Sequence, residues 1–374
     1  MKHLFEVEQK PLLSILTSMQ PICTKRTALE TTGTILFHLE HKELILKSTD
    51  LEISLQASCP IENNTVPGSV TFLVAGKRIF ELVKELDGLI SCSLEHNQLT
   101  LRSGNVSLFL HIKDAQEFPP FPERIENLMH FDATFLLDML EKVAFLIPQH
   151  NANQALNGLL LEISAHAMSM TTTDGHCLAQ VKTNNYHLTH DCQWLLPRRA
   201  IFEVKKILEN SSEKTIFLGT SGQQLVFSGD TFNFFTKILT DTFPQYNSIL
   251  NKEGFNGAAI DRQHLIKALR RSICMLSGQF IATQFGFSPA SLDIQMYNKE
   301  VGTLHEKVDI EKFEGETLDI RFYAPYLLNG LQAVQDSKIT LHLKSPSRPV
   351  IFESNSNSIH FTYLVMPVSP SLNS

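Results

Sequence analysis

The chain has 374 residues and an ordinary hydrophobic content of 43%, which predicts two or three domains that can each bury a core. Its charged first ten residues do not resemble a signal peptide, and no apolar run approaches the roughly 20 residues of a membrane span. The formal net charge of −7 argues against general affinity for nucleic acid, and six scattered cysteines without a CxxC pair suit reduced thiols in the cytoplasm.

The first third of the chain alternates predicted helices with predicted hairpins. An apolar stretch with helical spacing covers Pro11–Met19, and a second amphipathic helix is expected over 75–86. Period-two patterns over 35–48 and 99–112 each break at a polar centre, which indicates two antiparallel hairpins.

The middle and last thirds repeat this order of elements. Helical patterns and hairpins recur at 135–147, 197–208, 225–239, 264–276, 324–334 and 350–365. The period of very roughly 120 residues is that of a domain, because solenoid repeats are much shorter. Helices that alternate with antiparallel hairpins predict an α+β fold, with helices on one face of each sheet.

Proline-containing segments separate the three repeats. Residues 114–127 and 240–257 each contain a Phe-Pro pair shortly before the next repeat starts. We therefore predict three similar domains, each with two helices packed on antiparallel sheet, over residues 1–127, 128–251 and 252–374.

A short motif ending in aspartate occupies the same place in the first two repeats. Ser48–Asp50 corresponds to Thr172–Asp174. We interpret both aspartates as turn residues whose carboxylates accept hydrogen bonds from nearby backbone N–H groups, not as a catalytic pair.

No motif points to catalysis or to a cofactor. The chain has no GxSxG, Walker or glycine-rich phosphate-binding pattern, and its acids are too scattered for a two-metal nuclease. A zinc hypothesis could use five residues of the middle repeat, but their spacing forms no closed ligand set: His176, Cys177, His187, His190 and Cys192. We expect no enzyme activity, no metal and no cofactor.

Basic residues gather on several predicted helices of this acidic chain. They are either solvated faces of amphipathic helices or a local positive field that attracts phosphates. Taken alone, the pattern favours solvated faces, because charged faces are the default for surface helices. The residues concerned are Lys77, Arg78, Lys84, Arg198, Arg199, Lys205, Lys206, Arg262, Lys267, Arg270 and Arg271.

Short segments along the whole chain together form a family pattern. They are STDLEISL (48–55), AGKRIFELVKEL (75–86), LRSG (101–104), EFPPF (117–121), LNGLLLE (156–162), TDGHCLA (173–179), LPRRAIFEV (196–204), DTFPQY (241–246) and YLVMP (363–367). The TDGH tetrapeptide and the closing YLVMP strand are the most specific. In this order and at these spacings, the chain resembles the bacterial DNA polymerase III β subunit family, the sliding clamps.

The resemblance implies a DNA tether without catalytic activity. Two subunits of three clamp domains each would form a dimeric ring around double-stranded DNA, so that each chain is half of the ring. The ring would tether the replicative polymerase by raising its effective concentration at the primer end. Implied partners are the DNA polymerase III α subunit and other polymerases, the clamp loader δ subunit, and mismatch repair and ligase-type proteins. The alternative is a clamp-like repair platform or inhibitor target without replicative duty.

The resemblance also implies three sets of site residues. Partner peptides would dock in a cleft between the second and third domains, built from Leu156, Thr173, Gly175, His176, Cys177, Leu178, Pro244, Ile249, Tyr323, Tyr326, Pro349, Leu364, Met366 and Pro367. DNA would face Lys25, Arg26, Arg78, Arg198, Arg199, Lys205, Arg270, Arg271 and Phe280. The dimer seam would bring an edge strand with Leu108 and Leu110 against Met275 and Leu276 of the other subunit.

Three neutral residues depart from the family pattern. Cys177, Ser248 and Ser369 stand where family members usually or often have arginine. The cleft should therefore be less basic, and it should hold acidic features of a partner peptide less well.

Overall fold

A computed structural model describes residues 3–65, 68–122, 124–278 and 280–369. The chain folds into two compact units. Unit 1 comprises the residues up to Leu137 together with Arg199–Ile238, and unit 2 comprises Asp138–Arg198 together with the residues from Leu239 onward. Within the described ranges, no helix is long and apolar enough to cross a membrane.

The described residues form six α-helices, which confirms the six predicted ones. They are α1 (Gln9–Cys23), α2 (Gly76–Lys84), α3 (Ala133–Ala144), α4 (Arg198–Asn210), α5 (Arg262–Cys274) and α6 (Ala324–Gln332). Each helix buries one stripe. In α1, for example, Leu12, Leu16 and Met19 are at most 1% exposed, because their spacing of three and four residues places them on one face. Short 3-10 turns lie at η1 (Glu30–Gly33), η2 (Ala115–Glu117) and η3 (Gln154–Leu156).

The sheet of unit 1 contains twelve antiparallel strands in its described part. In spatial order they are β1 (His3–Glu8), β6 (Leu89–Glu95), β7 (Gln98–Ser103), β8 (Val106–Asp114), β5 (Val70–Ala75), β2 (Thr34–Leu39), β3 (Glu43–Thr49), β4 (Ile53–Pro60), β16 (Phe232–Lys237), β15 (Gln224–Ser228), β14 (Thr215–Ser221) and β9 (Glu126–Asp132). The first eight belong to the first sequence repeat and the last four to the second.

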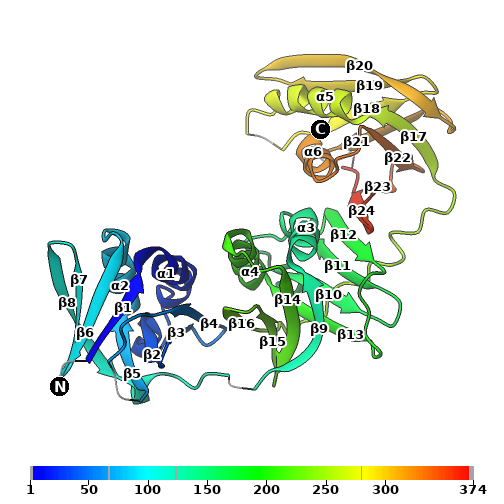
Figure 1. Cartoon of the computed structure of the whole chain (residues 1–374). Coiled ribbons are helices and arrows are strands. Elements are labelled where there is room, and N and C mark those ends of the chain that lie inside the picture. The colour runs from blue at the N-terminus through cyan, green and yellow to red at the C-terminus, as the bar shows by residue number, and fades with distance from the viewer. Residues whose placement is uncertain (1–2, 66–67, 123, 279, 370–374) are drawn as a thin grey trace. The chain divides into compact units, whose positions relative to one another are not determined.

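The sheet of unit 2 also has twelve strands among the described residues. Their order is β13 (Cys192–Pro197), β10 (Gly158–Ile163), β11 (Met168–Thr173), β12 (Cys177–Thr183), β24 (Ile359–Val365), β23 (Val350–Ser356), β22 (Lys338–Leu343), β17 (Asn256–Asp261), β20 (Gly302–Phe313), β19 (Ser291–Asn298), β18 (Thr283–Phe287) and β21 (Leu318–Phe322). The middle repeat thus divides its strands between the two units. Figure 1 draws the strands of this repeat in turquoise to green.

The four predicted hairpins are confirmed as β2–β3, β7–β8, β15–β16 and β23–β24. In β2 and β3 buried residues alternate with half-buried ones, as a period of two requires when one face of a sheet is covered. In β15 and β24 the buried residues run on consecutively, so both faces of these strands are covered. The three domain ranges predicted from the repeats stay a prediction, because the compact units cut across the middle repeat.

Candidate functional site

The turn between β11 and β12 is built by the TDGH motif of unit 2. Oδ1 of Asp174 accepts hydrogen bonds from the backbone N–H groups of His176 and Cys177, at 2.8 and 2.7 Å. Gly175 has a φ of +93°, which glycine adopts without strain, and its N–H donates to Oγ1 of Thr173 at 3.1 Å. The predicted turn role of Asp174 is confirmed. The turn leaves His176 exposed and directs Leu178 into the core.

Four aromatic rings line up beside this turn. The ring of His176 stacks on Tyr326 with centroids 5.7 Å apart, Tyr326 contacts Tyr323 at 5.0 Å, and Tyr323 stacks on Phe280 at 4.5 Å. Burial and the charge of Asp174 raise the pKa of Tyr326 to about 12, so its hydroxyl stays protonated near neutral pH. The start of α6 therefore presents polarisable, hydrogen-bonding aromatic surface to the turn.

The end of β24 lies against the same turn. Leu364 is the register partner of Leu178, and the N–H of Met366 donates to the carbonyl of His176 at 2.8 Å. Met366 is 37% exposed where the chain leaves the sheet, and Pro367 after it is half-buried. A flexible methionine at a surface beside apolar floor residues is typical of an adaptable binding surface.

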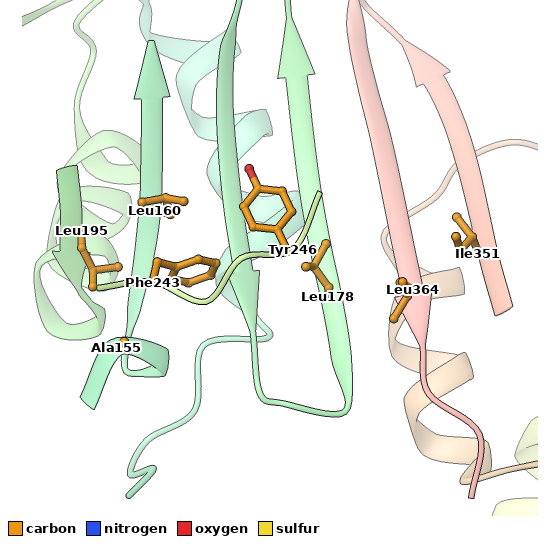
Figure 2. Close-up of a cluster of buried hydrophobic side chains, with 8 residues drawn as sticks. All are labelled: Ala155, Leu160, Leu178, Leu195, Phe243, Tyr246, Ile351 and Leu364. Carbon is orange, nitrogen blue, oxygen red and sulfur yellow. The ribbon is translucent and has the colours of Figure 1, made fainter. Parts of the chain in front are cut away.

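A buried apolar cluster includes Leu178 after the turn and Leu364 near the end of β24, and Figure 2 shows its side chains. Strands of the second repeat and strands of the third contribute to it, and the connecting segment 239–255 adds two aromatic side chains. Its members are Ala155, Leu160, Leu178, Leu195, Phe243, Tyr246, Ile351 and Leu364. The cluster holds the β12–β24 junction together by burial of apolar surface.

A hydrogen-bond network fixes the connecting segment to the sheet. The hydroxyl of Tyr246 donates to Glu162 at 2.5 Å and accepts from Gln180 at 3.1 Å. Burial and the neighbouring Glu162 raise the pKa of Tyr246 to about 12. Because Tyr246 is anchored, the segment also holds Pro244 and Ile249, which are exposed.

All predicted cleft residues lie in unit 2, at different depths. The residues exposed at the surface are Gly175, His176, Pro244, Ile249 and Met366, and the half-buried ones are Tyr323, Tyr326 and Pro367. The buried ones are Leu156, Thr173, Cys177, Leu178, Pro349 and Leu364. Their role in binding peptides stays a prediction. The sequence analysis did not identify Phe243, Tyr246 and Ile351 as members of the buried cluster that supports the predicted cleft. It recognised the segment with Phe243 and Tyr246 only as a boundary between repeats.

Cys177 does not face the surface as its family position suggested. Its side chain is 1% exposed, and burial, with the charge of Asp174, raises its pKa well above the ordinary range. The thiol is therefore a neutral core group, and a docked peptide would not touch it.

Two of the predicted DNA-facing residues, Lys25 and Arg199, form ion pairs around the buried carboxylate of Asp50 in unit 1. Nη1 of Arg199 pairs with Oδ2 of Asp50, and Nη2 donates to the carbonyl of Pro21 at 2.8 Å. Nζ of Lys25 lies 3.6 Å from the same Asp50 oxygen and pairs with Glu52. Burial raises the pKa of Asp50, but the Arg199 hydrogen bond, the N–H groups of Ile53 and Glu52 and the Arg199 charge together hold it below its ordinary value.

The other predicted DNA-facing residues differ in how they are engaged. Arg78 pairs with Glu81 at 3.0 Å, Lys205 with Glu209 at 3.4 Å, and Nε of Arg271 donates to Glu306 at 2.7 Å. Nε of Arg198 donates to the carbonyl of Ile147 at 3.0 Å.

Arg26 and Arg270 are exposed and make no ion pair with any described residue. Phe280 is 51% exposed and lies in the aromatic row of unit 2. Gln279 beside it lies outside the described residues.

The predicted seam residues are only partly on open surface. Leu108 and Leu110 are half-buried on β8. Among the described strands, residues 106–111 of β8 pair with β7 alone, whereas residues 112–114 pair with β5. The expected edge strand is therefore an edge over its first part. Met275 is half-buried after α5, and Leu276 is 5% exposed, so its side chain packs within unit 2.

Cysteines and histidines form no recognisable ligand set in the part of the chain that the structure describes. No group of three or more His, Cys, Asp or Glu residues there could hold a metal ion. All six cysteines are free thiols, and only Cys274 is exposed.

Comparisons with known proteins agree along the whole chain. Three family models match in succession: the DNA polymerase III beta subunit N-terminal domain over residues 3–122, its central domain over 131–245 and its C-terminal domain over 247–369. The beta sliding clamp of Pseudomonas aeruginosa is 27% identical over 375 residues, covering 97% of this chain and 99% of that protein. That of Pseudomonas putida is 25% identical over 373 residues, with the same coverage.

A crystal structure of the Pseudomonas aeruginosa DNA polymerase sliding clamp with ligand has the same fold. It superposes with a TM-score of 0.89 at 22% identity and covers 98% of this chain and 100% of that one. The three successive models leave only short gaps between 3 and 369. The chain therefore belongs to the DNA polymerase III beta subunit family, the sliding clamps, which raise the processivity of a polymerase without catalysing a reaction themselves.

Proposed function

We propose that the chain forms half of a head-to-tail dimeric ring that encircles double-stranded DNA in the cytoplasm and tethers the replicative polymerase. The observation that carries this proposal is how the repeats join. The fourth strand of the first repeat pairs with the last strand of the second, β4 with β16. The fourth strand of the second repeat pairs with the last strand of the third, β12 with β24.

In the described part of the chain, the fourth strand of the third repeat and the last strand of the first repeat have no such partner. Among the strands that the structure describes, residues 302–309 of β20, the fourth strand of the third repeat, pair with β19 alone, and residues 106–111 of β8 pair with β7 alone. Open edges of this kind are usually covered or paired, because they template association. If β20 of one copy pairs with β8 of another, the fourth strand of one repeat again pairs with the last strand of another repeat, as at the two internal junctions. In a closed dimer neither edge then remains open.

Contact with DNA in this proposal is weak and independent of sequence. A sliding tether needs a mild positive lining and topological closure, because contacts to base edges would stop it at particular sequences. Arg26 and Arg270 support the proposal most directly, since their charges are not neutralised by a described acidic side chain.

Docking of partners in this proposal uses the surface around the β11–β12 turn, α6 and the end of β24. Partners would be the DNA polymerase III α subunit and other polymerases, the clamp loader δ subunit, and mismatch repair and ligase-type proteins. A short peptide with glutamine, leucine and a terminal aromatic residue would place its apolar end over Leu156, Leu178 and Leu364, beside exposed Met366. The buried cluster beneath supplies a rigid base, which lowers the cost of ordering the site on binding.

The test combines the mass of the chain with its retention on DNA. Light scattering at micromolar concentration should give twice the mass of one chain. After loading by a clamp loader, the protein should stay on closed circular primed DNA and leave when the circle is cut. A monomer at all concentrations, or equal retention on linear and circular DNA, would contradict the ring.

A further inference from the structure

The two junctions between repeats are built in the same register. At the first junction Asp50 begins the turn before β4, and Ile53 pairs with Thr236. At the second, Asp174 begins the turn before β12, and Cys177, also three residues later, pairs with Val365.

The hydrogen bonds of the two turns also correspond. The N–H of Lys237 donates to the carbonyl of Glu52 at 2.9 Å, as that of Met366 donates to His176 at 2.8 Å. Leu51 has a φ of +73°, in the place that Gly175 occupies in the second turn. The two junctions can therefore be compared residue by residue.

The two aspartates use their first oxygen in the same way. Oδ1 of Asp50 accepts from the N–H groups of Glu52 and Ile53 at 3.0 and 2.8 Å. Oδ1 of Asp174 accepts from the residues two and three positions later at 2.8 and 2.7 Å. In both turns the second oxygen is left to interact with another group.

The second oxygen is where the junctions differ. At the first junction, Oδ2 of Asp50 pairs with Arg199, the second residue of α4, and Lys25 lies nearby. The second residue of α6, in the corresponding place, is Pro325, which has no charge. Asp174 is half-buried and forms no ion pair with any residue that the structure describes.

Three side chains whose pKa values the charge of Asp174 raises are uncharged near neutral pH. Its carboxylate contributes to the raised pKa values of Tyr326, Cys177 and Tyr363. Each stays uncharged near neutral pH, so none neutralises the carboxylate. A negative charge thus stands beside the proposed docking surface, next to His176 and Tyr326, without a cation of its own.

We propose that Asp174 determines specificity by accepting a cationic side chain, arginine or lysine, of the docked partner. The partner's cation would take at Asp174 the place that Arg199 takes at Asp50. This inference rests on the proposed docking function and adds to it a chemical class of partner residue. Guanidinium is the favoured group, because it donates to a carboxylate in a fixed planar geometry.

The test uses peptides with a glutamine, leucine and terminal aromatic core. One arginine is placed at each flanking position in turn, and each peptide has a twin with neutral citrulline there. Calorimetry should find a position at which arginine binds roughly fivefold tighter than citrulline, the range of a partly exposed ion pair. The preference for arginine should vanish in Asp174→Asn, because asparagine carries no negative charge. The turn should remain intact, because the amide oxygen of asparagine can still accept the backbone hydrogen bonds. Asp191→Asn, an exposed acid elsewhere in unit 2, should leave the preference for arginine unchanged.

A second variant supplies the cation within the chain. Pro325→Arg should remove the arginine preference while the citrulline twin still binds, because the new guanidinium would occupy Asp174 as Arg199 occupies Asp50. Equal binding of every arginine and citrulline pair, or a preference that survives in Asp174→Asn, would overturn the assignment of Asp174. Loss of binding for all peptides to the wild-type chain would instead contradict the docking function itself.

Discussion

Met366 tests the docking surface at the scale of one side chain. It is 37% exposed at the end of β24. Burying a whole large apolar side chain contributes about 1.5–3 kcal/mol, and burying the exposed part of Met366 under a peptide contributes the corresponding fraction. Met366→Ala should therefore weaken binding of the glutamine–leucine peptide by about three- to sixfold, with the dimer intact. Met129→Ala, at a half-buried methionine on β9 of unit 1, is the matched control. Unchanged affinity in Met366→Ala would remove the docking assignment.

The burial of Cys177 reverses what its family position suggests. From sequence, Cys177→Arg should leave peptide binding unchanged or strengthen it for acidic peptides. Because the side chain is 1% exposed beside Tyr363, the variant would bury an unpaired cation. We expect Cys177→Arg to lower the melting temperature strongly, whereas Cys177→Ala should lower it only slightly. A melting temperature of Cys177→Arg equal to that of the wild type would contradict this expectation and show that the arginine side chain reaches solvent.

Asp50 makes stability depend on pH. Its folded-state pKa lies below the ordinary 3.8, so the carboxylate contributes stability above that pH and loses the contribution as the pH falls below it. Asp50→Asn should cost on the order of 1–3 kcal/mol at neutral pH. In urea titrations the gap to wild type should narrow between about pH 5 and pH 3. A gap that is constant with pH would be contradictory, and Asp230→Asn, at an exposed acid, is the control.

At the scale of elements, the open part of β8 is the proposed site of association between two copies. Phe109 is 58% exposed on this segment, whereas Leu276 is 5% exposed and packs within its own unit. Phe109→Asp should shift the chain from dimer to monomer in sedimentation, because it places a charge in an apolar seam without a partner. Leu89→Asp, at a 42% exposed position of β6, should leave the dimer intact. A stable dimer of Phe109→Asp would contradict the β8–β20 seam.

At the scale of the whole molecule, we expect the proposed lining charges to govern retention on DNA. Arg26→Glu with Arg270→Glu should shorten the lifetime on circular DNA and reduce its dependence on salt, because fewer counterions are displaced. Lys42→Glu with Lys182→Glu makes the same change in total charge at other exposed positions. Retention that falls equally in both variants would show that only the overall charge matters.

Arg199 would be a poor probe of that lining. Its guanidinium holds Asp50 at the first junction, so its reversal would place two carboxylates together there. A loss of DNA retention in Arg199→Glu would report a disturbed junction as much as a lost phosphate contact.

Local patterns in the sequence determined the six helices, the four hairpins and the turn role of Asp50 and Asp174. These features depend on residues within a few positions of one another. The stripe of Leu12, Leu16 and Met19 and the alternation of β2 and β3 are visible without the rest of the chain. The repeated motifs likewise indicated the family before any strand order was known.

Tertiary structure alone decided how the middle repeat divides its strands, which left the open parts of β8 and β20. It also decided that Cys177 is buried, and that Arg199 reaches Asp50 across 149 positions of the sequence. No local period encodes which distant strands pair or which distant charges meet. These outcomes follow from the burial of surfaces that only the assembled sheets create, because the free energy of such contacts depends on neighbours far away in the chain.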